Sequence, residues 1–175
     1  MEEEIELTYL AKSLPKDLFE YPHKEMIDLY IPAAFDHPTI RIRKNGDKYV
    51  ITKKEPYEDT PNDTSHMLEQ TIKITEKEFS EFIKFPAKKV EKHRYEYPYQ
   101  GLTAEFDVFQ GDLAGLVLID FEFKTREEQA KFIMPDFCLV EVTQEKFIAG
   151  GMLCGKKYSD IEKQLVSYQY QKLLT

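Results

Sequence analysis

The feature that most constrains this chain is a set of like-charged residues that recur two positions apart within alternating segments. Successive side chains of a β-strand point to opposite faces, so residues two apart share one face. Neighbouring like charges on one face repel each other, so their repetition along the chain indicates that the charges serve a common function. Five such pairs occur: Glu4 and Glu6, Arg41 and Arg43, Lys92 and Arg94, Glu105 and Asp107, and Asp120 and Glu122.

The alternation predicts a protein rich in β-strands. Asn45-Gly46 between two of the alternating segments is a strong hairpin signal. A polar stretch with two prolines, residues 55–66, is typical of an exposed loop. The sequence predicts eight strands, at residues 4–9, 39–43, 49–54, 69–74, 90–97, 102–109, 116–123 and 137–142.

Three capping-box patterns predict helices at the periphery of this sheet. A hydroxyl residue followed three positions later by Glu can satisfy the free N–H groups that begin a helix. The patterns are Thr75 with Glu78, Thr125 with Glu128, and Ser159 with Glu162, and they predict helices at 76–84, 126–132 and 160–173. Shorter helices are expected at 14–20 and at 146–153, although Gly150-Gly151 weakens the second. The expected class is a single α+β domain over residues 1–175.

Composition narrows the possible partners and the compartment. The 175 residues carry a net charge of −8, which disfavours nucleic acids and anionic membranes as partners. The N-terminal Met-Glu-Glu-Glu lacks a basic and an apolar signal region, and no run of 18 apolar residues occurs, so we expect a cytoplasmic protein. Cys138 and Cys154 are expected to be buried apolar side chains, and the four scattered histidines suggest no zinc site.

The same-face charges have two physical explanations. One is a solvated outer face of a sheet that covers a core. The other is a closed barrel whose charged lumen is surrounded by apolar strand faces and outer helices. In the second case the basic pairs would hold a polyanion and the acidic pairs a divalent metal ion.

The order of the charged motifs resembles that of a known family. Glu4-Ile5-Glu6, Arg41-Ile42-Arg43, Lys54, Lys92-His93-Arg94 and Asp120-Phe121-Glu122 resemble the fingerprint of the triphosphate tunnel metalloenzymes of the CYTH superfamily, in their compact bacterial type. The resemblance is strongest over residues 4–153 and does not cover the C-terminal helix expected within 158–175. It implies a closed antiparallel eight-stranded β-barrel with a charged lumen, peripheral helices, and hydrolysis of a linear triphosphate.

The resemblance also implies roles for individual residues. Arginine suits phosphate because its planar guanidinium donates paired hydrogen bonds, and Mg²⁺ or Mn²⁺ prefers carboxylate oxygens. Glu4, Glu6, Lys54 and Lys92 are the expected catalytic residues. The expected phosphate ligands are Arg41, Arg43, Lys54, Lys92, Arg94, Lys73, Lys146 and Tyr30. The expected metal ligands are Glu4, Glu6 and Glu122, with Asp120, Glu69, Glu105 and Asp107 as second choices.

Two departures from the family pattern leave several functions open. Thr8 stands where the family has a lysine, and Thr71 stands where it has a second acid, so a phosphate-binding cation is missing unless Lys73 replaces it. The favoured hypothesis is metal-dependent hydrolysis of inorganic tripolyphosphate. The alternatives are a class IV-type adenylate cyclase or an organic triphosphatase, a catalytically impaired polyphosphate- or nucleotide-binding domain, and a β-rich interaction domain. The expected partner is a small polyanion, tripolyphosphate or a nucleoside triphosphate, and a homodimer is compatible with the sequence.

Overall fold

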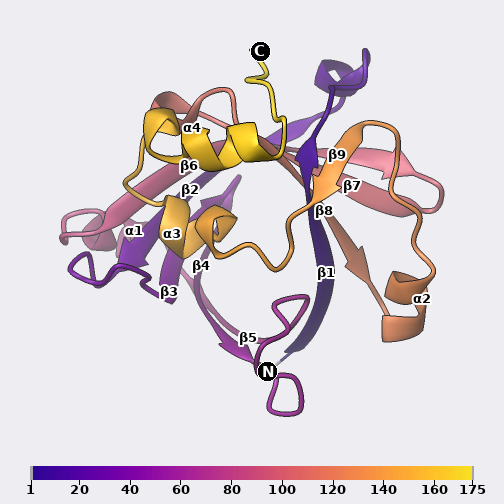
Figure 1. The fold of residues 1–175 in the computed structure, drawn as a ribbon. Coiled ribbons are helices and arrows are strands. Elements are labelled where there is room, and N and C mark those ends of the chain that lie inside the picture. The colour runs from indigo at the N-terminus through magenta and orange to yellow at the C-terminus, as the bar shows by residue number, and fades with distance from the viewer. Residues whose placement is uncertain (1, 175) are drawn as a thin grey trace.

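A computed structural model describes residues 2–174 and shows a closed barrel of eight antiparallel strands (Figure 1). The ring closes because β1 pairs with β8 over Ile5–Leu10 and with β5 over Glu2–Ile5. A ninth strand, β9 (Cys138–Glu141), pairs with the second half of β1. Around the ring the strands are β1 (Glu2–Ala11), β5 (His66–Ile74), β4 (Lys48–Pro56), β3 (Ile40–Asn45), β2 (His23–Ile31), β6 (Lys88–Tyr99), β7 (Leu102–Phe109) and β8 (Val117–Phe123).

Short helices lie around this barrel. α1 (Glu76–Phe82) contacts β3 and β4, and α2 (Arg126–Ala130) contacts β1 and β8 on the outside (Figure 1). None of the helices within residues 2–174 is long and apolar enough to cross a membrane. The remaining helical elements are η1 (Leu18–Glu20), η2 (Gly111–Leu113), η3 (Lys146–Ile148), α3 (Gly150–Leu153) and α4 (Tyr158–Ser167).

The barrel contains one strand that the alternation did not predict. Residues 23–31 form β2, and the predicted segment 137–142 forms β9, which lies outside the closed ring. The predicted number of barrel strands was therefore right, but residues 137–142 were predicted in the place that residues 23–31 occupy. β2 escaped prediction because its apolar residues occupy both faces in the run Met26-Ile27-Asp28-Leu29-Tyr30, which hides the period of two.

The predicted helix starts are only partly confirmed. Thr75 and Glu78 form both halves of a capping box, with N–H···O distances of 2.7 and 3.2 Å. Thr125 accepts the N–H of Glu128 at 3.1 Å, which is the first half of a box. The prediction at Ser159 was wrong: α4 begins at Tyr158 and ends at Ser167 rather than at 173. The helix expected at 14–20 is only η1, and the one at 146–153 is divided into η3 and α3.

Apolar side chains fill one end of the barrel lumen. Leu10, Tyr30 and Leu118 share strand faces with lumen-facing charged residues, yet they pack into one buried cluster with Leu153 of α3 and Ile161 of α4. The polar part of the lumen is thereby confined to the rest of the barrel. The outward strand faces form two further clusters, one around Phe106 and Phe121 and one around Ile42 and Phe79 of α1.

Gly150 and Gly151 allow α3 to approach the barrel closely. A Cβ atom at Gly150 would overlap the hydroxyl of Tyr30, and one at Gly151 would overlap the Pro38 carbonyl and the His37 ring. The glycine pair, which disfavours a helix by propensity, is therefore explained by packing.

Removing one buried hydroxyl is expected to loosen the attachment of the C-terminal segment. The Tyr170 hydroxyl accepts the N–H of Val117 and donates to the carbonyl of Gly115, each at 2.8 Å. Tyr170→Phe leaves the Val117 N–H unpaired, which should lower the unfolding free energy by about 1–3 kcal/mol. Urea denaturation measures the change, with Tyr99→Phe as the control because the Tyr99 hydroxyl hydrogen-bonds, within the described part of the chain, only to the side chain of the exposed Gln100. Equal stabilities of the two variants would contradict this packing.

Candidate functional site

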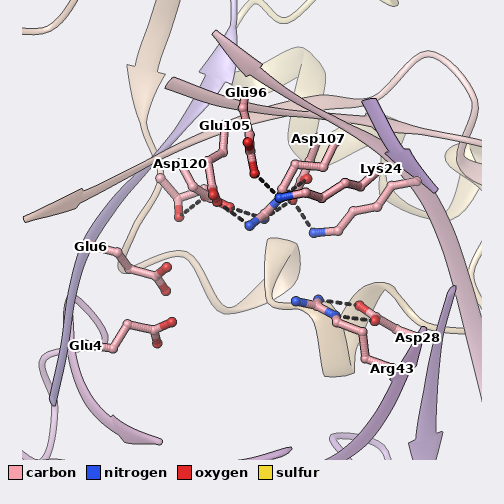
Figure 2. Close-up of polar contacts among 12 residues, drawn as sticks. Glu4, Glu6, Lys24, Asp28, Arg43, Glu96, Glu105, Asp107 and Asp120 are labelled. Atoms are coloured by element: carbon pink, nitrogen blue, oxygen red, sulfur yellow. Dashed lines mark hydrogen bonds and ion pairs between the residues drawn. The ribbon is translucent and has the colours of Figure 1, made fainter. Parts of the chain in front are cut away.

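The strand register turns all five same-face charged pairs into the barrel lumen. Residues opposite each other on antiparallel strands point to the same face. Figure 2 shows Glu4 and Glu6 extending from β1 into the same space as Arg43 and the carboxylates of β7 and β8. The opposing lumen pairs include Glu6 with Glu122, Thr8 with Asp120, Asp28 with Arg43, Lys54 with Glu69, Arg94 with Asp107, and Glu105 with Asp120.

The lumen has a basic side and an acidic side. The lumen face of β3–β5 carries Arg41, Arg43, Lys54 and Lys73, whereas the lumen face of β1, β7 and β8 carries the carboxylate pairs. β6 lies at their junction and contributes Lys92 and Arg94. A small polyanion and a cation could both be accommodated on such a surface.

Asp28 fixes Arg43 through a two-point ion pair. The Nε and Nη2 atoms of Arg43 donate to the two carboxylate oxygens of Asp28 at 2.5 and 2.6 Å. Burial would raise the pKa of Asp28, which is 2% exposed, but Arg43 outweighs burial and lowers it to about 2. Sequence reasoning missed Asp28, although a single carboxylate within an apolar strand was a usable signal.

Arg94 is held by three carboxylates. Its Nε and Nη2 atoms donate to Asp107 at 2.6 and 2.7 Å, and Nη2 also donates to Asp120 at 3.0 Å. Nη1 pairs with Glu105, and the buried Lys92 pairs with Asp107. Four of the five N–H donors of the guanidinium are therefore used, which fixes its plane.

The acidic side carries more negative charge than its cations neutralise. Burial raises the pKa of Glu105 to about 7. Arg94 lowers this pKa, whereas the neighbouring carboxylates Asp120 and Glu122 raise it. Burial also raises the pKa of Asp120 and of Glu122, with the charge of Glu6 as a further cause for both. Crowded carboxylates of this kind favour a bound cation.

The donor atoms on this side suit Mg²⁺ or Mn²⁺, which prefer oxygen ligands. Glu4, Glu69 and Glu122 line one recess of about 210 Å³ beside the first residues of β1. Among the side chains of residues 3–174, however, no three from Asp, Glu, His or Cys converge closely enough to hold a metal ion as they stand. The carboxylate chemistry fits a divalent ion, and binding would require these side chains to rotate.

Lys54 and Arg41 are residues of the basic side that approach carboxylates of β1 and β5. Lys54 pairs with Glu4 and lies 3.5 Å from Glu6 and 3.8 Å from Glu69. Burial would lower the pKa of Lys54, but Glu6 and Glu4 raise it, so the ammonium stays charged. Arg41 lies 3.6 Å from Glu69, and nothing in the described part of the chain accepts a hydrogen bond from its buried Nε.

The remaining sequence candidates occupy different places. Tyr30 faces the apolar end of the lumen beside Arg41, and burial raises the pKa of its hydroxyl. Lys73 is exposed near the end of β5. Lys146 is exposed on η3. Burial of the His37 ring lowers the pKa of His37, and the positive charge of Lys146 lowers it further.

The histidines and cysteines that the sequence did not favour as site residues lie outside the charged part of the lumen. His93 stacks on His23 across the outer faces of β6 and β2, with ring centroids 4.6 Å apart. Cys138 and Cys154 are free and buried, and burial raises their thiol pKa values to about 12 and about 11. Such thiols are poor nucleophiles, as expected.

Comparisons with known proteins agree with this geometry. No family model matches the chain. The chain is 30% identical to the inorganic triphosphatase of Nitrosomonas europaea over 148 residues, which cover 82% of this chain and 91% of that protein. It is also 30% identical to the inorganic triphosphatase of Acetivibrio thermocellus over 127 residues, 71% of this chain and 77% of that protein.

Solved structures show the same fold. The crystal structure of the inorganic triphosphatase NE1496 superposes with a TM-score of 0.63 at 25% identity and covers 89% of this chain and 97% of that one. A putative adenylate cyclase from Bacillus halodurans has a TM-score of 0.54 at 16% identity, with 100% of this chain and 95% of that chain covered. The closed eight-stranded barrel is thus the fold of a solved triphosphatase.

The Asp28–Arg43 pair predicts a specific loss of stability in acid. The folded-state pKa of Asp28 lies below its unfolded value, so its contribution is complete above about pH 4 and is lost as the pH falls through about 2. Asp28→Asn should destabilise the protein by about 3–5 kcal/mol near neutrality, because it leaves Arg43 without its charged partner. The difference in unfolding free energy between Asp28→Asn and the unsubstituted protein should shrink by about 2 kcal/mol as the pH falls from about 4 to about 2.

Urea denaturation across the acidic range measures this difference. Asp36→Asn, in the exposed turn between β2 and β3, is the matched control and should show no such trend. A constant difference between Asp28→Asn and the unsubstituted protein would contradict the ion pair.

Proposed function

The chain belongs to the inorganic triphosphatase family of the CYTH (triphosphate tunnel) superfamily, and on this premise we propose that it hydrolyses a linear triphosphate in the barrel lumen with a divalent metal ion. The substrate that we propose is inorganic tripolyphosphate. The observation that carries the proposal is the buried Nε of Arg41, which has no acceptor within residues 3–174 although it lies in a lumen rich in carboxylates. A donor left unpaired in such a place favours an anionic ligand.

The basic side supplies the phosphate contacts in this proposal. Asp28 engages Nε and Nη2 of Arg43, so the Nη1 donors lie on the other side of the guanidinium. Arg41 lies two residues before Arg43 on β3, and Lys54 lies on the neighbouring strand β4, so both extend the same surface. Neutralising the phosphate oxygens with fixed donors lowers the barrier to phosphoryl transfer because charge on those oxygens is stabilised without rearrangement.

The acidic side supplies the proposed metal ligands. Glu4, Glu6 and Glu122 would hold Mg²⁺ or Mn²⁺, with Asp120, Glu105 and Asp107 as second choices, together with Glu69, which comes from β5. A divalent ion held there would neutralise phosphate charge and polarise the phosphoryl group. Lys54 is the residue that connects the two sides, because it pairs with Glu4 and Glu6 in the free protein and can donate to a phosphate oxygen instead. A catalytically impaired binding domain remains the alternative because Thr8 carries no charge.

Substitutions on the two faces of one strand test the site. Arg41 and Lys44 lie on opposite faces of β3, Arg41 in the lumen and Lys44 outside. Arg41→Ala should lower kcat/KM for tripolyphosphate by about 100- to 1,000-fold, the loss expected for one charge-stabilising donor. Lys44→Ala should leave it unchanged. Phosphate release is measured with Mg²⁺, with Mn²⁺ and with a chelator.

The same assay distinguishes the alternative functions. Parallel reactions with ATP and thiamine triphosphate test an organic triphosphatase, and a cyclic nucleotide product would indicate a cyclase. Tight binding of tripolyphosphate without turnover would support the binding domain. Equal losses of kcat/KM in the Arg41 and Lys44 variants, or an absence of any triphosphate binding, would contradict the proposal.

A further inference from the structure

The two threonines at which this chain departs from the family pattern share a local role. The Thr8 hydroxyl donates to Oδ1 of Asp120 at 2.7 Å, and the Thr71 hydroxyl donates to Oε1 of Glu69 at 2.7 Å. Each accepting carboxylate lies beside an arginine of the lumen: Asp120 beside Arg94 and Glu69 beside Arg41. Both threonines therefore orient an acid that faces a cation.

Thr8 is the more firmly held of the two. It is 7% exposed, and Asp120 is its register partner on β8. Its N–H donates to the hydroxyl of Thr143 at 3.1 Å, and its carbonyl accepts the N–H of Val142 at 2.8 Å. The backbone of Thr8 is thus fixed by β8 on one edge and by the residues after β9 on the other, so its side-chain oxygen has a defined position.

Asp120 connects Thr8 to Arg94 through hydrogen bonds at both of its carboxylate oxygens. Its Oδ1 atom accepts from Thr8, and its Oδ2 atom accepts from Nη2 of Arg94 at 3.0 Å. The carboxylate is held at both oxygens, and the same Nη2 atom also donates to Asp107. The hydroxyl adds no charge, so three carboxylates still face the two cations of this cluster, Lys92 and Arg94.

We propose that Thr8 is a positioning residue that orients Asp120 and, through it, the guanidinium of Arg94, so that the acidic side of the lumen is ordered before a polyanion enters. The hydrogen bonds alone support the ordering of Asp120 and Arg94. The role of this ordering in polyanion binding rests on the function proposed above. A lysine at this position would instead add a charge. Thr8 supplies orientation in place of that charge.

Thr71 offers an internal comparison. It is exposed, and the Arg41–Glu69 distance of 3.6 Å is longer than that between Arg94 and Asp120. Because hydrogen bonds that water can replace contribute less, the hydroxyl of Thr71 should matter less than that of Thr8.

Removing the hydroxyl while keeping the shape tests the proposal. Thr8→Val has nearly the same shape as threonine, and Thr8→Ser keeps the donor. We expect Thr8→Val to weaken tripolyphosphate binding about 10-fold by calorimetry, since a hydrogen bond to a charged group is lost. Thr8→Ser should bind as the unsubstituted protein does. Thr71→Val should show a smaller loss, and Thr103→Val, on an exposed position of β7, none.

A double variant separates this effect from general damage to the fold. In an Asp120→Asn background, Thr8→Val should cause a much smaller additional loss of affinity, because the charged acceptor of its hydrogen bond is already gone. Equal effects of Thr8→Val with and without the Asp120 substitution would overturn the proposal. So would a Thr8→Ser variant as weak as Thr8→Val.

An NMR measurement decides the ordering without any ligand. The Nε–H signal of Arg94 should be sharp in the unsubstituted protein and in Thr8→Ser, and should shift and broaden in Thr8→Val. An unchanged signal in Thr8→Val would refute the positioning role even if the protein hydrolyses tripolyphosphate. A changed signal in a protein that binds no triphosphate would support the ordering and refute the proposed function instead.

Discussion

The structure depends on the pairing of opposite charges inside a closed sheet. Removing an ion from water costs several kcal/mol unless partners and hydrogen bonds replace the lost hydration. Asp28 therefore holds Arg43 at two points, and Asp107 holds both Arg94 and Lys92. Because these partners come from neighbouring strands, the register of the barrel and the order of its charges support each other.

The same pairing explains how an acidic protein can offer a basic surface. The net charge of −8 is an average over the chain, whereas Arg41, Arg43 and Arg94, three of its four arginines, face the lumen. Lysines are distributed over both surfaces; Lys44 and Lys53, for example, lie on the outer face. The charge therefore disfavours large external polyanions but says little about a small one inside the barrel.

The sequence predicted the lumen well because strand alternation is local. Each same-face pair needed only a spacing of two, and the structure places all five pairs inside. β2 could not be found in this way, because Met26 and Ile27 put apolar groups on both of its faces, and Asp28 was missed with it. The role of Thr8 depends on which residue of β8 lies opposite, and no local pattern encodes that register.

We expect the triphosphate to lie within the barrel, against the basic side of the lumen. A crystal structure of the protein with tripolyphosphate and Mn²⁺ tests this most directly. A phosphate oxygen should lie within hydrogen-bond distance of the Arg41 guanidinium, and the metal ion should lie among the carboxylates of β1 and β8. Tripolyphosphate bound only on the outer surface, with the lumen ion pairs unchanged, would contradict it.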